Sequence, residues 1–211
     1  LKFRKSGHVH SMKKKSIIWM FFLAAAVIFS VVWTKEKDGR ADQKIKQGVV
    51  RFHIRANSDS RKDQAEKLLV RDQVVAYLKP YMEQANTKED AKRILNSRKK
   101  EIAKVAKSTL QKRGKDLPVK VYLTREKFPE KDYGSYVFPE GTYDALRIDL
   151  GNASGHNWWC VMFPDLCITK ESEAAKDKKT RKKLEQQVGK KGVEKLEKKK
   201  EKLPWFLKWL E

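Results

Sequence analysis

Residues Gly155–Cys167 read GHNWWCVMFPDLC, and this stretch decides the kind of domain that the chain forms. From Asn157 to Phe163 it is apolar almost throughout, as a central strand covered on both faces would be. Neighbouring side chains on a strand point to opposite faces, so Trp158 and Trp159 should lie on opposite sides of the sheet. We expect one of them in the core between sheet and helices, and the other either in the core too or exposed as an anchor for a partner.

The same stretch holds both cysteines of the chain and one of its four histidines, which raises the question of catalysis. A reactive thiolate needs partial exposure and a neighbouring base, but Cys160 lies in the most apolar strand of the chain. The interval between Cys160 and Cys167 lacks the paired short spacings of a structural zinc site. We therefore predict no catalytic residue, no metal and no cofactor. The proline turn between the cysteines could bring them together in a disulfide worth about 2.5 kcal/mol, and two buried free thiols are the equally open alternative.

Upstream of this stretch, apolar residues recur at every second position, which is typical of strands. This spacing appears in PVKVYLT (118–124), YGSYVFPEG (133–141) and TYDALRIDL (142–150). The loop GNASGH is short enough for a hairpin, so the strands on either side of it are expected to pair antiparallel.

The first strand and the helices are predicted from residues 49–114. In VVRFHIRANSDS (49–60), apolar side chains at Phe52, Ile54 and Ala56 alternate with Arg51, His53 and Arg55, which predicts a strand with one buried side. Ser60 followed by Asp63 resembles a helix N-cap. Leu68, Val75 and Met82 then fall at intervals of seven and predict an amphipathic helix of about 20 residues. A second long helix is expected from Thr87 to Gly114.

These elements predict one ordered domain over residues 49–169. Its fold class is α+β, with two long helices packed on a largely antiparallel sheet of about five strands. An N-terminal hydrophobic segment and a charged C-terminal tail flank the domain.

The N-terminal segment bears on localisation. Residues 16–34 are apolar and follow three lysines, so they predict a signal peptide or a signal anchor. Residues 1–15 then form a short basic region on the cytoplasmic side, and the linker 35–48 leads to a domain outside the cytoplasm. Met12 directly precedes the lysines, as an initiator would, so the residues before it are either an upstream misread of the start or a short cytoplasmic tail.

The charge of the chain is strongly basic, with 49 Lys and Arg against 27 Asp and Glu. Such a surplus suggests an acidic partner, and export disfavours nucleic acid. Residues 170–202 carry 14 basic and 7 acidic side chains and are expected to form a solvated helix or a disordered tail. Residues 203–211 read LPWFLKWLE; they are expected to lie on a membrane surface through Trp205, Phe206 and Trp209, or else to dock on the domain.

Polar residues cluster where the first strand must turn into the first helix. Helix capping accounts for about half of this cluster, and pairs such as Asp144 with Asp149 or Asp59 with Asp63 are expected in so charged a chain without function. A role in partner binding is nevertheless predicted for six residues at this turn and at the start of the last strand: Arg55, Asn57, Ser58, Asp59, Asn157 and Trp158.

Two long motifs carry a resemblance to a known family. RFHIRANSDSRKDQAEKLLVRDQVV (51–75) resembles the R-x-x-x-x-ANSDS-x-x-DQ-x-x-K-x-x-VRD opening of the stage II sporulation protein R family. YGSYVFPEGTYDALRIDLGNASGHNWWCVMFPDLC (133–167) is similar to the second conserved stretch of that family, including NWWCV and the final LC. The resemblance covers the whole predicted domain and leaves out the tail from Lys170 onward.

The resemblance implies a signalling protein that is not an enzyme. Such proteins are made in the forespore and exported into the space that faces the mother cell. There they activate a membrane-embedded aspartic-type protease, stage II sporulation protein GA, which processes pro-sigma-E to active sigma-E. Two other classes stay open as alternatives: an enzyme of the cell envelope that uses Cys160 or the acids, and a scaffold held at the membrane surface by charge and C-terminal aromatic residues.

Overall fold

The structure is a computed structural model that describes Trp19, Phe29 and the residues 39–164, 166–167 and 178–197. The chain divides into two units, Leu1–Arg40 and Ala41–Glu211. In the first unit, Trp19 and Phe29 are helical and exposed. The rest of the predicted segment 16–34 and all of 203–211, including Trp205, Phe206 and Trp209, lie outside the described residues. No helix in the described part of the chain has the length and apolar character needed to cross a membrane.

The second unit is an α+β domain, as predicted. It begins with helical residues 41–48. The later elements are β1 (Val50–Arg55), α2 (Arg61–Met82), α3 (Lys88–Ser97), α4 (Lys99–Gln111), β2 (Val119–Phe128), β3 (Lys131–Tyr133), β4 (Tyr136–Phe138), β5 (Gly141–Leu150), β6 (Asn157–Phe163), α6 (Lys178–Val188) and α7 (Lys190–Leu196).

The main sheet has four strands in the order β2-β5-β1-β6, and β3 and β4 form a separate hairpin. β1 is parallel to β5 and antiparallel to β6. The predicted hairpin between β5 and β6 is therefore wrong, because β1 lies between them. The prediction of a largely antiparallel sheet of five strands also needs correction to a mixed sheet of four. A short loop permits a hairpin, but here it spans one strand, and β1, whose side chains are buried on both faces, lies between β5 and β6.

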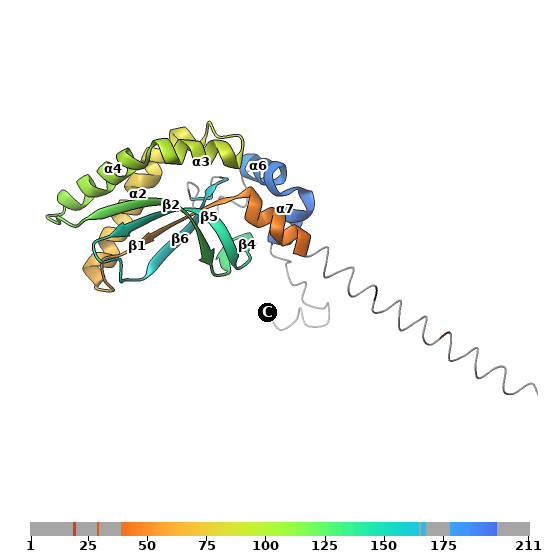
Figure 1. Ribbon diagram of the computed structural model, residues 1–211, viewed down its shortest axis with the longest axis horizontal. Helices are drawn as coiled ribbons and strands as arrows, with labels where there is room; N and C mark the ends of the chain where they lie inside the picture. The colour runs from red at the N-terminus through yellow and green to blue at the C-terminus, as the bar shows by residue number, and fades with distance from the viewer. Residues whose placement is uncertain (1–18, 20–28, 30–38, 165, 168–177, 198–211) are drawn as a thin grey trace, which may run out of the picture. The chain divides into compact units, whose positions relative to one another are not determined.

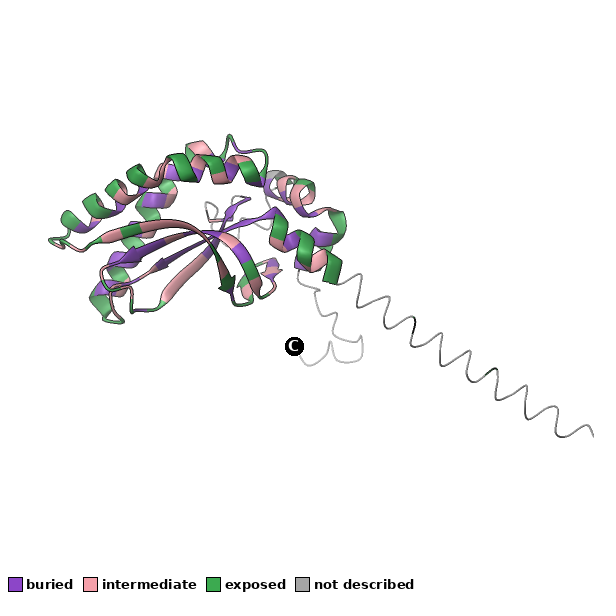
Figure 2. Cartoon of the chain, in the orientation of Figure 1, coloured by how far each residue is buried: buried purple, intermediate pink, exposed green. Residues whose placement is uncertain are grey.

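The central position of β1 also corrects its predicted burial. Phe52 and Ile54 face the helices, and Arg51 and His53 on the other side are buried as well, with exposed fractions of 0% and 3%. We call the side of the sheet under α2, α3 and α4 the covered face and the other side the open face (Figure 1). In Figure 2, much of the central part of the sheet is coloured as buried.

The helix α2 begins at a side-chain cap, because Ser60 Oγ accepts a hydrogen bond from the Asp63 backbone N at 3.1 Å. Its buried apolar residues are Val70, Val74, Leu78 and Met82, four residues apart, which differs from the predicted interval of seven. The predicted Leu68 is 38% exposed. Because an α-helix has 3.6 residues per turn, residues four apart lie on nearly the same face of the helix. This face of α2 packs against the sheet.

The second predicted helix is two helices, since the backbone leaves helical geometry at Arg98 between α3 and α4. α3 starts with a capping box in which Thr87 and Asp90 each accept a hydrogen bond from the other's backbone N–H. The break lets both short helices follow the twisted sheet, and Arg98 lies 4.0 Å from the ring centre of Tyr81 on α2.

Part of the charged stretch 170–202 belongs to the domain, which corrects the expectation of a solvated or disordered tail. α6 and α7 place Leu184, Val188, Val193 and Leu196 in the core. Polar contacts to distant segments hold these helices in place: Gln187 Nε2 donates to Asn86 O at 2.9 Å, and Lys195 pairs with Asp42 at 2.9 Å. The prediction relied on the basic composition of the stretch and overlooked these four apolar residues at helical spacing.

Candidate functional site

The six predicted binding residues meet at one end of the sheet, where β1 ends and β6 begins. In the antiparallel register, Arg55 lies opposite Asn157 and Ile54 lies opposite Trp158. The turn after β1 and the loop before β6 therefore lie side by side. The six residues therefore lie close together, but their side chains make different contacts.

Asn57 connects the turn after β1 to the loop 151–156. Its Oδ1 accepts a hydrogen bond from Asn152 N at 2.9 Å, and its backbone O accepts from Ser154 Oγ at 2.7 Å. Gly155 N donates to Ala56 O at 3.0 Å. We call the paired segments 56–60 and 151–156 the loop clasp.

The glycines of the loop clasp permit this close approach. Gly151 has φ +58°, and a Cβ there would collide with the Asn57 side chain. At Gly155, a Cβ would collide with the backbone O of Ser58. The GNASGH sequence is therefore explained by contact between the two loops.

Asp63 in the first turn of α2 accepts hydrogen bonds from polar side chains of the loop clasp. It accepts hydrogen bonds from Ser58 Oγ at 2.6 Å and Asn57 Nδ2 at 2.8 Å, and Lys115 Nζ lies 3.4 Å away. The hydrogen bonds from Ser58 and Asn57 and the charge of Lys115 lower the pKa of Asp63 to about 2. The side chains of Asn57 and Ser58 thus form hydrogen bonds within the domain. Any influence of these two residues on partner binding would come from their role in holding the loop in position.

Asp59 is the exposed member of the predicted cluster. Its Oδ1 accepts a hydrogen bond from the backbone N of His156 at 2.6 Å and also meets the ring Nδ1 of His156. The backbone hydrogen bond from His156, followed by the side-chain one, lowers the pKa of Asp59. The side chains are 53% and 82% exposed, so this pair presents a charge and a ring to the solvent.

Next to Arg55, the open face carries a charge network that the sequence analysis did not single out. We define it as His53, Arg55, Glu126, Arg147 and Asp149. Arg55 Nε lies 2.9 Å from Asp149 Oδ1, and Arg147 Nε lies 3.3 Å from Asp149 Oδ2. Arg147 also pairs with Glu126, and His53 Nε2 lies 2.9 Å from Glu126 Oε2. Cations and anions therefore alternate across β1, β5 and β2.

Aromatic rings flank this network. Trp159 stacks on His53 with ring centres 4.7 Å apart and an interplanar angle of 2°. Tyr122 lies under the Arg147 guanidinium at 4.3 Å. Asn157 Oδ1 is 3.3 Å from His53 Nδ1. The half-exposed Trp159 and Tyr122 make the open face amphipathic around its charges, as protein contact surfaces are.

Burial controls the charge state of His53. Desolvation lowers the pKa of this imidazole, and Glu126 and Asn157 offset only part of that effect. His53 is therefore neutral near pH 7. The alternation of Leu146 and Ile148 with Arg147 and Asp149 was the signal that could have revealed the network, because it placed both charges on one side of a strand.

Trp158 points to the covered face, away from the charge network. Its ring meets Phe52 edge to face at 5.8 Å, and the Arg71 guanidinium of α2 lies 5.0 Å from it. Trp158 and Trp159 thus occupy opposite faces, and both are half-buried. Between them, Trp159 is the one beside the charges.

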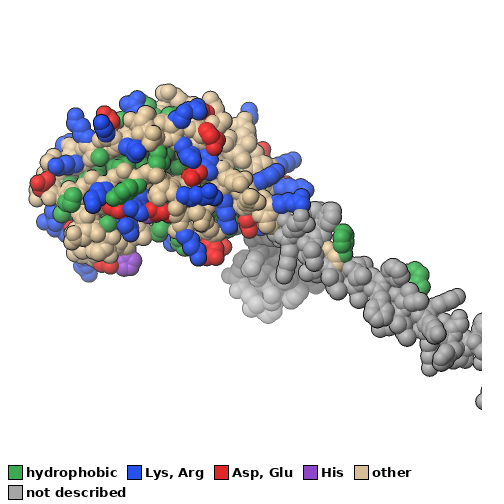
Figure 3. Space-filling view, in the orientation of Figure 1, with side chains coloured by type: hydrophobic (Ala, Val, Ile, Leu, Met, Phe, Trp, Pro, Cys, Tyr) green, Lys and Arg blue, Asp and Glu red, His purple; other side chains and the backbone are tan. Residues whose placement is uncertain are grey.

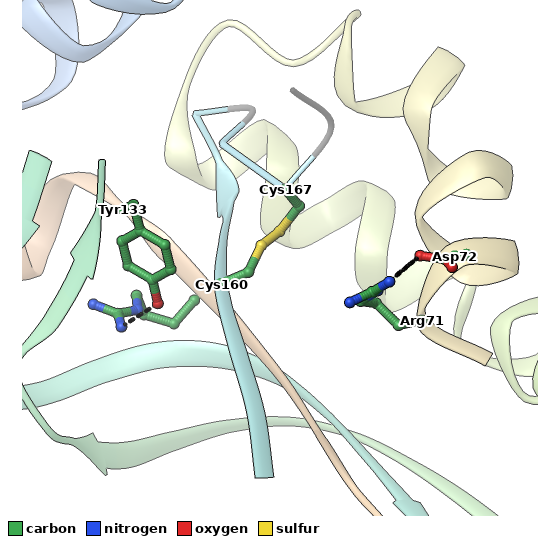
Figure 4. Close-up of a disulfide and its surroundings, with 6 residues drawn as sticks. Arg71, Asp72, Tyr133, Cys160 and Cys167 are labelled. Atoms are coloured by element: carbon green, nitrogen blue, oxygen red, sulfur yellow. Dashed lines mark hydrogen bonds and ion pairs between the residues drawn. A yellow bond between two sulfur atoms is a disulfide. The ribbon is translucent and has the colours of Figure 1, made fainter. Parts of the chain in front are cut away.

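Cys160 and Cys167 form a disulfide, with their Cα atoms 5.6 Å apart (Figure 4). Cys160 lies on β6 opposite Phe52, and Cys167 N donates to Val161 O at 3.1 Å, so the bond closes the turn after β6 on the strand itself. With both sulfur atoms in the disulfide, Cys160 has no thiol for nucleophilic chemistry.

Under the β3–β4 hairpin, Arg51 on the open face is fully buried among aromatic rings. Its guanidinium lies 4.8 Å from the ring centre of Phe128 and 5.0 Å from that of Tyr143. Nη2 donates to Tyr133 OH at 3.0 Å. This cation is enclosed and contributes to packing, in contrast with Arg55 at the other end of the strand.

Fold and site together define an α+β domain that presents a partly exposed charged and aromatic surface beside a hydrogen-bonded loop clasp, an arrangement suited to contact with another macromolecule. The family model of stage II sporulation protein R matches residues 46–173. The chain is also 35% identical over 185 residues to "Stage II sporulation protein R" of Bacillus subtilis (strain 168), a match that covers 85% of this chain and 83% of the relative.

The chain belongs to the stage II sporulation protein R family. This membership supports a role in sporulation, and the family is known as one of signalling proteins rather than enzymes. No solved structure shows significant similarity to the chain.

Proposed function

We propose that this protein is an exported forespore signal that activates the membrane-embedded aspartic-type protease, stage II sporulation protein GA, and so triggers the conversion of pro-sigma-E to active sigma-E in the mother cell. Membership of the family, over the whole of the predicted domain, is the observation that carries this proposal. The apolar segment 16–34 after three lysines supports export into the space between forespore and mother cell.

In this proposal the protein acts by binding, without chemistry of its own. A ligand shifts an equilibrium only by its difference in affinity for the two states, so the signal must bind the active arrangement of the protease more tightly than the inactive one. A coupling of about 1–3 kcal/mol is the usual scale for such an effect.

The contact surface in this proposal is the end of the sheet where the predicted residues meet. Asp59 and His156 are exposed at the loop clasp. Arg55 and Asn157 lie beside Trp159 on the open face. A hydrogen-bonded loop clasp favours binding, because the surface pays little ordering entropy when a partner docks.

The test is co-expression of the full chain with the protease and pro-sigma-E in a host that does not sporulate, with cleavage of pro-sigma-E as the readout. The full chain is required because α6 and α7 contribute to the core. Asp59→Arg reverses an exposed charge at the centre of the proposed surface and is expected to reduce cleavage at least about tenfold.

Glu83→Arg is the matched control. It makes the same charge change at an exposed residue that follows the last turn of α2, about 33 Å from the start of that helix. Thermal unfolding of both variants shows whether the domain remains folded. Full cleavage with folded Asp59→Arg would exclude this surface, and failure of the wild-type chain to trigger any cleavage would exclude the proposed function itself.

A further inference from the structure

A second polar site lies at the opposite end of β1 and on the covered face. Two adjoining cavities of about 330 and 260 Å³ share Arg125 and Asp144. The first is also lined by Lys46, Gln47, Lys88 and Glu89, and the second by Lys92, Leu123, Thr124 and Ala145. We call the two together the basic groove. It lies between α3, the helix before β1 and the strands β2 and β5, and it shares no residue with the charge network.

The basic groove is organised around one carboxylate. Lys88 Nζ lies 2.6 Å from Asp144 Oδ2, and Lys92 Nζ lies 3.3 Å from the same oxygen. Burial alone would raise the pKa of Asp144, but the hydrogen bonds and charges of Lys88 and Lys92 lower it below its ordinary value. Asp144 is thus ionised and holds two lysines in place.

Two further cations have no carboxylate of their own. In the part of the chain that the structure describes, no acidic side chain lies within ion-pair distance of Lys46 or Arg125. Arg125 is exposed and Lys46 half-exposed. Basic side chains are spread over the surface of the domain (Figure 3), so charge alone does not distinguish a site. The basic groove differs because its cations line two adjoining cavities, and Asp144 holds two of these cations in place.

We infer that the basic groove binds an extended acidic peptide segment of a partner protein. Its two cavities adjoin at Arg125 and Asp144, and Lys46 and Arg125 are available to pair with carboxylates placed along a chain. The partly buried side chain of Leu123 in the second cavity provides an apolar contact for the peptide. The inference does not depend on which protein supplies the segment, so it stands apart from protease activation.

Asp144 favours a peptide over a small anion. A phosphate bound between Lys92 and Arg125 would lie close to the Asp144 carboxylate, and the two negative charges would repel each other. An extended peptide places its carboxylates at the outer cations and offers a backbone N–H to Asp144, which can accept further hydrogen bonds. A membrane surface is also disfavoured, because the cations line a cavity and lipid headgroups meet a surface more readily than a groove.

The direct test is binding of a short synthetic peptide that alternates Glu and Thr to the purified full chain, measured by calorimetry. The double variant Lys46→Gln with Arg125→Gln removes both unpaired cations and leaves Asp144 with its lysines. We expect its dissociation constant to rise about tenfold. The matched control is Lys104→Gln with Lys112→Gln, two exposed residues on or just after α4, which loses the same charge and is expected to bind as wild type does.

Inorganic phosphate and phosphatidylglycerol vesicles are the comparison ligands. If the control loses as much affinity as the double variant, binding reflects net charge and the inference is overturned. It is equally overturned if the peptide does not bind, or if the double variant loses affinity for phosphate or vesicles while its affinity for the peptide is unchanged. Because the assay contains no protease, its outcome is independent of the proposed function.

Discussion

The two faces of the main sheet are both buried near the centre of β1, yet they are held together differently. On the covered face, Phe52 and Ile54 pack against apolar residues under the helices. On the open face, Arg147 pairs with Asp149 and Glu126, and Nε2 of the neutral His53 lies 2.9 Å from Glu126 Oε2. Apolar burial is the stronger source of stability, whereas the partly exposed pair of Arg55 with Asp149 contributes little and can exchange contacts with a partner. The comparison therefore assigns the larger part of the stability to the apolar residues of the covered face, and the proposed contact with the protease to the charged end of the open face.

The largest expected effect tests the covered face directly. Phe52→Ala removes a fully buried ring at the centre of the sheet and should lower the free energy of unfolding by about 3–5 kcal/mol. Urea denaturation of the full chain measures it. A loss below about 1 kcal/mol would show that this face is not the main source of stability, and the comparison would fail.

The disulfide adds a second contribution on the covered side, where Cys160 lies opposite Phe52. The double variant Cys160→Ser with Cys167→Ser should lose about 2.5 kcal/mol of unfolding free energy, because the closed loop restricts the unfolded chain. Wild-type protein in a reducing agent should show the same loss. If the double variant still triggered wild-type levels of pro-sigma-E cleavage by the protease at low temperature, where the variant stays folded, stability would be further separated from recognition.

An intermediate effect is expected at Asp63, which connects the loop clasp to α2. Its pKa of about 2 lies below the ordinary value of 3.8, so its contribution to stability is present above about pH 4 and is lost as the pH falls towards 2. Asp63→Asn should therefore be about 1–2 kcal/mol less stable than wild type at pH 6, and the difference should shrink at pH 2. A difference that does not depend on pH would contradict this assignment.

The smallest effect on stability is expected on the open face. Arg55→Gln removes a guanidinium whose side chain is 36% exposed, and it should cost less than about 1 kcal/mol of unfolding free energy. Under the proposed function, the same variant should reduce cleavage of pro-sigma-E in the co-expression assay. A variant that is clearly destabilised but activates fully would reverse the roles assigned to the two faces.

Much of the domain was predictable because its signals are local. A few neighbouring residues determine each of these features: the strand at 157–163, the cap at Ser60 and the capping box at Thr87. The opposite orientations of Trp158 and Trp159 follow from the two-residue period of a strand. The break at Arg98 was not predictable, since the apolar spacing continues through it.

The candidate site was predictable only in part. Arg55, Asn57 and Asp59 could be predicted as site residues because they lie within five positions of one another in the sequence. Asn157 could be predicted because it begins the last strand. It could not show that Asn57 holds the loop 151–156, since the two segments are about a hundred residues apart in the chain. Arg147 and Glu126 were missed for the same reason, because each looks like an ordinary surface charge until its partner is known.

The sequence by itself determined the family, the α+β class and the starts of α2 and α3, because these depend on motifs and on periodicity along the chain. Tertiary structure alone decided that β1 lies between β5 and β6, that α6 and α7 join the core, and that the charges of three strands form one network. The physical reason is that strand order and charge pairing depend on which distant surfaces bury the most apolar area together, and a local pattern contains no information on that choice.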